Sequence, residues 1–169
     1  PDGVARYRDG RFETPAVAAG VTNASSVLAA ADGSLWIGTH AGLKHVVSGR
    51  FEDSVPADNA EVASIAATVD GRIWAGTQNG LYSFQGGKPA GMAGKAEGGA
   101  PVSGFASDEN NALAGAEDGG LLVGTAKGLA ITAAEARLAG SRIFPAAEGL
   151  PADRVAWIRE DREGAMWVA

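Results

Sequence analysis

The chain contains no cysteine, which excludes disulfide bonds and thiolate metal sites. This absence permits an oxidising compartment but does not require one. No run of eighteen apolar residues occurs, so the sequence predicts no transmembrane helix within it. The 14 Lys and Arg residues are scattered singly and the formal net charge is −6, which argues against nucleic-acid binding. Any contact with a membrane would therefore come through segments outside this chain.

Short catalytic motifs are missing as well. The chain has no Gly-x-Ser-x-Gly elbow, no phosphate-binding loop and no His-Glu-x-x-His pattern. Its two histidines, His40 and His45, are five residues apart around a predicted hairpin, with no carboxylate at ligand spacing. We therefore predict no metal site, no cofactor and no catalytic residue, so that this chain is not itself an enzyme.

What the chain has instead is a repeated tetrapeptide. Trp36-Ile37-Gly38-Thr39 returns as Trp74-Ala75-Gly76-Thr77 and as Leu122-Val123-Gly124-Thr125, and it begins again at Trp167. The stretches 24–36 and 62–74 align without a gap, 38 residues apart, and a Gly-Leu pair follows each complete tetrapeptide. Repeats of this length predict a solenoid or a propeller, in which each unit buries its face against a neighbour.

Each repeat is composed of short predicted strands. The runs 62–68, 72–77 and 81–85 are rich in β-branched and aromatic residues, a weaker run follows near 88–92, and Asp-Gly, Asn-Gly and Gly-Gly turns separate them. Helical repeats would need a 3.6-residue apolar period, and the 25 glycines and 7 prolines oppose it. Four antiparallel strands in about 40 residues form the blade of a β-propeller, so we predict an all-β propeller fold.

The repeat also resembles that of a known family. Val62-x-Ser64-Ile65, followed by Asp70-Gly71-x-Ile73-Trp74-Ala75-Gly76-Thr77 and Asn79-Gly80-Leu81, is similar to the two-component regulator propeller repeat, whose pattern is roughly V-x-S-I-x-x-D-x-x-G-x-L-W-I-G-T-x-x-G-L. The copy at 26–43 matches nearly as well, whereas Leu122 replaces the Trp and the copy at Trp167 breaks off. The resemblance covers almost all of the chain.

This resemblance implies a role in signalling. Members of the family are mostly extracytoplasmic sensor regions of bacterial membrane proteins, on the periplasmic or extracellular side of the inner membrane. An immunoglobulin-like domain, a transmembrane helix and a histidine kinase or diguanylate cyclase follow them. The resemblance therefore implies a ligand-sensing domain, often for glycans, that passes its signal to a following domain.

The repeats make residues 1–169 a single partial propeller. We predict an outer half blade at 1–23, blades at 24–61, 62–101 and 102–154, and an inner half blade at 155–169. Either the half blades join into a free-standing four-bladed ring, or the chain is a piece of a larger ring of about seven blades. The lack of an initiator Met and the interruption within a strand favour the second interpretation. An open array exposes a blade face at each end, which predicts a homo-dimer or marginal stability.

Recurring residues are assigned to packing and turns. The tryptophans of the tetrapeptide are expected to fill the space between adjacent blades, with a sugar-stacking platform as the alternative. They are Trp36, Trp74 and Trp167. The Asp-Gly pairs at 32–33 and 70–71 are expected at hairpin tips, where they supply a positive φ, and not as paired catalytic acids.

The third repeat is irregular, because 102 to 122 takes twenty residues where the other repeats take twelve. We predict an insertion at 107–120, in an acidic and polar loop. Insertions in repeat arrays lie on one face and sometimes form a binding surface. The loop is either simply solvated or binds a cation or a partner through Asp108, Glu109, Glu117 and Asp118.

A ligand is expected over the central channel of the propeller. The loops before the innermost strands and those between the second and third strands share that face, which would also carry Asn23, Asn59 and Glu61. The threonines of the tetrapeptide, Thr39, Thr77 and Thr125, are expected to form hydrogen bonds within the turn. The polar residues that follow them vary, which suits recognition better than packing. We therefore predict ligand contacts from His40, Gln78, Asn79 and Lys127.

Three functions are compatible with such a fold. The first is a non-catalytic sensor that binds a small molecule or an oligosaccharide. The second is a lyase or hydrolase, which would need His, Glu or Asp residues converging on one face. The third is an interaction propeller that uses the acidic insertion as its contact. The fold alone does not choose among them, and the family resemblance favours the sensor.

Overall fold

The chain folds into sixteen short β-strands within the part that a computed structural model describes. That part comprises residues 3–14, 21–52, 60–77, 80–93, 112–126, 128–133, 137–145, 148–150 and 154–169. No helix among these residues is long and apolar enough to cross a membrane.

The strands form five antiparallel sheets, in which neighbouring strands follow one another along the chain. Three sheets have four strands each, and we name them blades A, B and C. Blade A contains β3 (Ala24–Ala29), β4 (Leu35–Thr39), β5 (Gly42–Val47) and β6 (Arg50–Glu52). Blade B contains β7 (Val62–Ala67), β8 (Ile73–Thr77), β9 (Gly80–Gln85) and β10 (Lys88–Ala93). Blade C contains β11 (Ala112–Gly115), β12 (Leu121–Thr125), β13 (Gly128–Ala133) and β14 (Arg137–Phe144).

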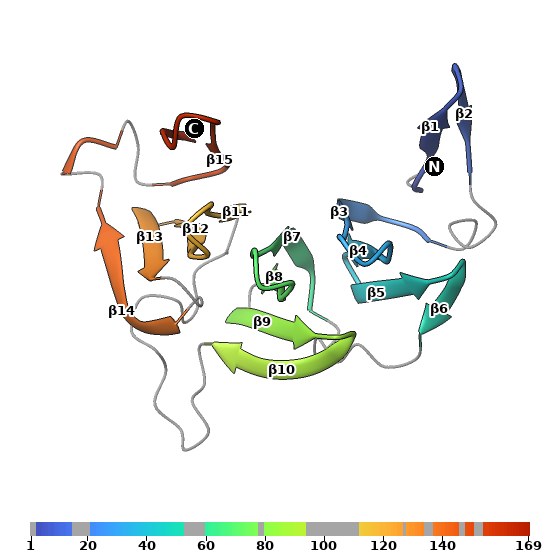
Figure 1. Cartoon of the computed structure of the whole chain (residues 1–169), viewed down its shortest axis with the longest axis horizontal. Coiled ribbons are helices and arrows are strands. Elements are labelled where there is room, and N and C mark those ends of the chain that lie inside the picture. The colour runs from blue at the N-terminus through green and yellow to red at the C-terminus, as the bar shows by residue number, and fades with distance from the viewer. Residues whose placement is uncertain are drawn as a thin grey trace.

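Two-stranded sheets flank the blades. The N-hairpin consists of β1 (Arg6–Arg8) and β2 (Arg11–Glu13), and the C-hairpin of β15 (Ile158–Glu160) and β16 (Met166–Val168). All five sheets lie along an open arc, with the first strand of each blade on the inner side (Figure 1). Strand β7 contacts β3 and β11, and β11 contacts β15. Radially arranged four-stranded sheets are the blades of a β-propeller. The predicted fold is therefore confirmed, as part of a ring with three whole blades and two half blades.

Blade C corrects one sequence prediction. Residues Ala112–Gly115 lie within the expected insertion at 107–120, yet they form β11, the innermost strand of the blade. The turn after β11 resembles those of the other blades, since the Asp118 carboxylate accepts a hydrogen bond from the Gly120 N–H at 2.8 Å. Alanine and glycine have low strand propensity, which concealed β11 in the sequence. The residues that lengthen this repeat therefore precede β11 instead of following it.

The core is divided into layers between adjacent sheets. We name them the A/B seam, the B/C seam and, between blade C and the C-hairpin, the C-terminal seam. The first residue of the tetrapeptide points toward the following sheet, so that Trp36, Trp74 and Leu122 lie in these three seams in that order. The next residue, such as Ala75 or Val123, packs against the preceding sheet. The alternation of side chains along one strand thus joins each blade to both neighbours.

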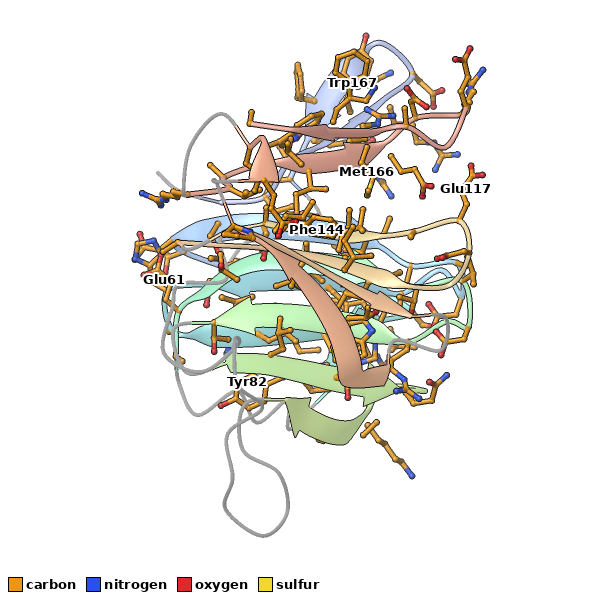
Figure 2. The ribbon with its side chains drawn as sticks, turned by 90° about the vertical axis from the view of Figure 1, so that its left-hand side faces the viewer. Glu61, Tyr82, Glu117, Phe144, Met166 and Trp167 are labelled. Atoms are coloured by element: carbon orange, nitrogen blue, oxygen red, sulfur yellow. The ribbon has the colours of Figure 1, made fainter. Side chains whose placement is uncertain are left out.

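The tryptophans follow the prediction at two of three positions. Trp36 and Trp74 are 1% and 3% exposed and fill their seams, and the Trp36 ring lies 5.3 Å from that of Phe84. Trp167, in contrast, is 61% exposed. Trp167 points to the far side of the C-hairpin, where no described residue covers it, so its packing against a following sheet stays a prediction (Figure 2).

The glycine of the tetrapeptide lets neighbouring blades approach closely. A Cβ atom on Gly38 would overlap Ser26 Oγ and lie 2.9 Å from Val62 Cγ1 and 3.0 Å from the Val62 carbonyl oxygen. A Cβ atom on Gly124 would lie 2.7 Å from Val155 Cγ1. Val62 begins the inner strand β7 of the next sheet, and Val155 lies just before the inner strand β15. The tetrapeptide therefore keeps glycine at this position because another backbone passes against it.

Candidate ligand-binding face

The threonine that ends each tetrapeptide closes the turn to the third strand. Its Oγ1 donates a hydrogen bond to the carbonyl oxygen of the glycine three residues later, at 2.7 Å from Thr39, 3.0 Å from Thr77 and 3.1 Å from Thr125. All three threonines are buried. Their predicted structural role is confirmed, and in blade A the turn presents His40 to solvent.

His40 is the predicted site residue that the structure describes. Its side chain is 61% exposed, and its backbone N–H donates to the Asn23 carbonyl oxygen at 3.2 Å. Its Nε2 lies 3.4 Å from Oε1 of Glu61, which directly precedes β7 of blade B. The His40–Glu61 pair therefore connects blades A and B at the predicted ligand-binding face.

Spacing in the sequence did not reveal this pair, because no carboxylate stands at ligand spacing from either histidine. His40 and Glu61 are far apart in sequence, and the packing of blade B against blade A brings them together. The repeat alignment nevertheless contains a signal for the proximity of these two residues. It places Glu61 immediately before the inner strand, at the same end of the blade as the turn that contains His40.

Most of the other residues predicted on this face lie outside the described part of the chain. Gln78, Asn79 and Lys127, and also Asn59, lie outside the described residues, so their roles stay predictions. Arg154 precedes the C-hairpin at the repeat position at which Glu61 precedes blade B, and it is exposed. The next residue, Val155, donates its N–H to the Thr125 carbonyl oxygen at 3.0 Å. The described part of the face thus carries four polar groups, which suit a polar ligand. They are the imidazole of His40, the carboxylate of Glu61, the amide of Asn23 and the guanidinium of Arg154.

At the end of the strands opposite the predicted ligand-binding face, carboxylates stabilise the hairpin turns by accepting hydrogen bonds. Figure 2 shows Glu61 and Glu117 at these two ends. The Asp32 carboxylate accepts hydrogen bonds from the Ser34 hydroxyl at 2.6 Å and the Ser34 N–H at 2.9 Å, which lower the pKa of Asp32. The Thr68 hydroxyl, at 2.6 Å, and the Arg72 N–H lower the pKa of Asp70 in the same way. The interpretation of the Asp-Gly pairs as turns is confirmed.

Two of the four acidic residues assigned to the third repeat, Glu117 and Asp118, are among the described residues, and each has its own contact. Asp108 and Glu109 lie outside the described residues. Asp118 holds its turn, and Glu117 donates its backbone N–H to Oε2 of Glu160 at 2.7 Å. Among the residues that the structure describes, no three His, Asp or Glu side chains are grouped closely enough to hold a metal ion.

The second histidine, His45, belongs to the core. It is 4% exposed in β5 and stacks on Trp36, with ring centroids 3.9 Å apart and an interplanar angle of 22°. Neither ring nitrogen has a hydrogen-bond partner among the described residues. Burial lowers the pKa of His45, and the nearby carboxylates of Asp32 and Glu52 partly oppose that shift. His45 is therefore a neutral packing residue of the A/B seam.

Comparison with known proteins supports the fold through solved structures. No protein-family model and no curated protein matches the chain. The extracellular domain of BT4673 from B. thetaiotaomicron, proposed to be a one-component system, superimposes with a TM-score of 0.73 and 19% identity, over 99% of this chain and 24% of that one. The extracellular domain of the proposed hybrid two-component system BT3049 from the same organism gives a TM-score of 0.65 and 19% identity, over 94% and 21%.

An enzyme shares the same architecture. Virginiamycin B lyase from Staphylococcus aureus superimposes with a TM-score of 0.65 and 13% identity, over 87% of this chain and 48% of the lyase. At these identities the likeness shows the propeller fold alone. The chain spans about a quarter of the length of the extracellular domains that it matches.

Proposed function

We propose that this chain is part of the extracytoplasmic, ligand-sensing propeller of a bacterial two-component signalling protein, and that it is not catalytic itself. The observation that carries the proposal is the superposition of 99% of the chain on an extracellular domain of this class. The tetrapeptide pattern of the two-component regulator propeller family supports it independently. The output domain, a kinase or a diguanylate cyclase, would then lie outside this chain.

The ligand in this proposal is a small polar molecule or an oligosaccharide. Its contacts come from His40 and, in the same turn of the other repeats, from Gln78, Asn79 and Lys127. The exposed imidazole of His40 can donate or accept a hydrogen bond, and Glu61 beside it is an acceptor. Such paired groups suit the hydroxyls of a sugar, and their position on turns leaves the packed blades undisturbed.

The test is ligand binding to the 169-residue chain. Defined oligosaccharides are screened by thermal shift, and hits are measured by calorimetry on the wild type and on His40→Ala. The expected result is a hit whose affinity falls at least about tenfold in His40→Ala, the loss of one or two hydrogen bonds. Arg162→Ala, in the exposed turn at the opposite end of the strands, is the matched control and should bind as the wild type does. Equal affinity in all three proteins would show that His40 does not contact the ligand.

A second candidate function is that of a propeller enzyme, which the likeness to virginiamycin B lyase favours. The chain would then be part of a lyase or hydrolase whose residues converge over the channel. Assays of the chain with virginiamycin B and with a sugar lactone test this candidate. Turnover that His40→Ala abolishes would replace the sensor proposal.

A further inference from the structure

Polar residues of blades A and B come together where the A/B seam opens onto the predicted ligand-binding face. His40 Nε2 lies 3.4 Å from Glu61 Oε1, and Ser25 Oγ donates a hydrogen bond to the carbonyl oxygen of Val62, the residue after Glu61. Both interactions cross from blade A to blade B. We name Ser25, His40 and Glu61 the junction site. Since blades A and B are both whole four-stranded sheets, this site is independent of the half blades at either end.

An irregularity in β3 directs Ser25 to the junction. The pairing of β3 with β4 shifts register between Ala24 and Ser26, so Ser25 is an extra residue in the ladder. Strand β7 has the same irregularity, and Ala63 occupies the equivalent place there. A β-bulge of this kind re-aims the side chain of its extra residue. Blade A therefore presents a hydroxyl group where blade B presents a methyl group.

The hydrogen-bonding capacity of the junction site is one-sided. Ser25 Oγ gives its proton to the Val62 carbonyl oxygen, so that its lone pairs remain for a ligand. The Glu61 carboxylate accepts hydrogen bonds and does not donate them. It also favours the tautomer of His40 with the proton on Nε2, because that proton faces Oε1, and this tautomer leaves Nδ1 as an acceptor. The three side chains therefore offer a ligand acceptors and a negative charge.

This combination selects the chemistry of the ligand. Among the described residues the ionic contact of Glu61 is with His40, and a neutral imidazole does not compensate a carboxylate. The complementary group has a positive charge, several N–H donors and no lone pair, which describes a protonated primary amine. A guanidinium is also positive, but its planar fork matches the two oxygens of one carboxylate better than acceptors from three side chains.

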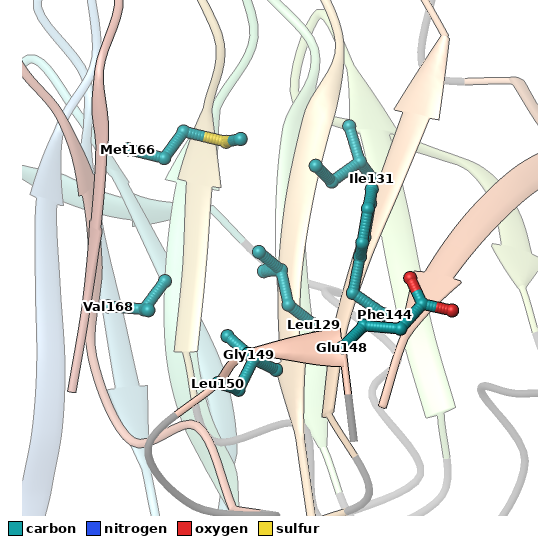
Figure 3. A pocket seen from close by; sticks show the side chains of 8 residues that line it. All are labelled: Leu129, Ile131, Phe144, Glu148, Gly149, Leu150, Met166 and Val168. Atoms are coloured by element: carbon teal, nitrogen blue, oxygen red, sulfur yellow. The ribbon is translucent and has the colours of Figure 1, made fainter. Parts of the chain in front are cut away.

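The pocket of the C-terminal seam offers no comparable chemistry. It has a volume of about 210 Å³ and lies between side chains of blade C and Met166 and Val168 of the C-hairpin (Figure 3). Its lining is apolar except for Glu148. A polar ligand would lose its hydrogen bonds with water there without replacing them. For such a ligand the junction site is the better of the two places.

We propose that the junction site binds a protonated primary amine, and that the ligand of this face is an amino sugar with a free amino group. The inference rests on the proposed function, because it names the ligand class of the same face. The ammonium group contacts Glu61 of blade B together with Ser25 and His40 of blade A. Ligand binding therefore adds a bridge between the two blades.

A matched pair of disaccharides tests the proposal. The 169-residue chain is titrated calorimetrically at neutral pH with the β-linked glucosamine disaccharide and with its N-acetylated form, which keeps the sugar rings and lacks the charged amine. The free amine should bind at least about tenfold more tightly, because hydrogen bonds between charged groups are the stronger ones. Diaminobutane, an amine without a sugar ring, should bind more weakly than the amino sugar. Equal affinity of these two amines would overturn the assignment to a sugar.

Three variants assign the preference to the junction site. Glu61→Gln keeps the shape of the side chain and removes its charge, so it should abolish the preference for the free amine. Glu163→Gln makes the same change of net charge in an exposed turn at the opposite end of the strands, and it should keep the preference. Ser25→Ala introduces the residue that blade B has at this position and should weaken binding of the amino sugar several-fold.

The outcomes separate a failure of this inference from a failure of the proposed function. A neutral oligosaccharide that binds through His40, with no gain from a free amine, would overturn the inference and leave the sensor proposal intact. An equal loss of preference in Glu61→Gln and Glu163→Gln would overturn the inference as well, by showing a general attraction of cations to the acidic chain. No binding of any sugar would contradict both proposals.

Discussion

The A/B seam and the C-terminal seam use the same positions of the repeat but are filled to different extents. In the A/B seam Trp36 lies between His45 and Phe84, and all three side chains are buried. In the C-terminal seam Leu122 replaces the tryptophan, and a pocket remains beside Met166. The difference shows that the tetrapeptide supplies only one side of each layer. The third strand of the following blade completes it.

The comparison also separates two roles of tryptophan. Trp36 and Trp167 occupy the same position of the repeat, yet their exposed fractions are 1% and 61%. The side chain of Trp167 is held at its edge by a hydrogen bond from its Nε1 to Asp161 Oδ2 at 2.7 Å. That bond is the first cause of the lowered pKa of Asp161. A repeat position therefore fixes the direction of a side chain, and the neighbouring sheet decides whether it is buried.

The largest effect is expected from the tryptophans themselves. Trp36→Ala should lower the free energy of unfolding by about 3–5 kcal/mol, because it removes a buried ring and leaves a cavity. Trp167→Ala, the matched control, should change it by about 1 kcal/mol or less, since the ring is mostly exposed. Urea denaturation followed by circular dichroism measures both. Equal losses would show that Trp167 is covered in solution.

The next largest effect concerns the close approach of the blades. Gly38→Ala should lower the free energy of unfolding by about 1–3 kcal/mol, because the new methyl group meets the Val62 carbonyl oxygen at 3.0 Å. Gly3→Ala is the control, because its Cβ atom would lie 3.5 Å from the Val21 carbonyl oxygen, an ordinary contact. The same denaturation experiment applies. A Gly38→Ala protein as stable as the control would mean that the blades are farther apart than described.

A pH dependence is expected from the A/B seam, because His45 is buried there. Burial lowers the pKa of His45 below its ordinary value of 6.5, so the unfolded chain binds a proton first as the pH falls. The free energy of unfolding should therefore decrease as the pH falls through 6.5, and the loss ends below the pKa of the folded state. One such group changes the free energy by at most about 1.4 kcal/mol per pH unit.

The two histidine variants separate the sources of this pH dependence. His45→Ser introduces the residue that blade B carries at the equivalent position, Ser83, opposite Trp74. This variant should lose the slope between about pH 7 and 5, where an ordinary histidine titrates, whereas His40→Asn should keep it. Denaturation at several pH values measures the slope. A slope that survives in His45→Ser would assign it to other groups.

The smallest effects are expected from polar contacts across the seams. Glu160→Ala should cost about 1 kcal/mol, because it removes the acceptor of the Glu117 N–H in the C-terminal seam. Glu61→Ala should cost about 0.5 kcal/mol or less, since its partner His40 is exposed and the pair is screened by solvent. Denaturation at low and high salt distinguishes them. A larger loss for Glu61→Ala would mean that the pair holds blades A and B together.

The sequence by itself determined the repeated unit. The tetrapeptide, the Asp-Gly turns and the Gly-Leu pairs are local signals, because turn geometry and strand alternation depend on residues close in the chain. They were sufficient to predict the propeller, the buried positions of Trp36 and Trp74 and the turn role of the threonines. They did not reveal β11, because its alanines and glycine give little strand signal.

Only the tertiary structure decided the features that involve residues of two different blades. It placed Glu61 beside His40, buried His45 against Trp36, left Trp167 exposed and opened the pocket beside Met166. Each of these results comes from the distance between segments in different repeats. A repeat pattern is the same in every copy, so it specifies which way a side chain points. The identity and presence of the neighbouring sheet specify what that side chain meets.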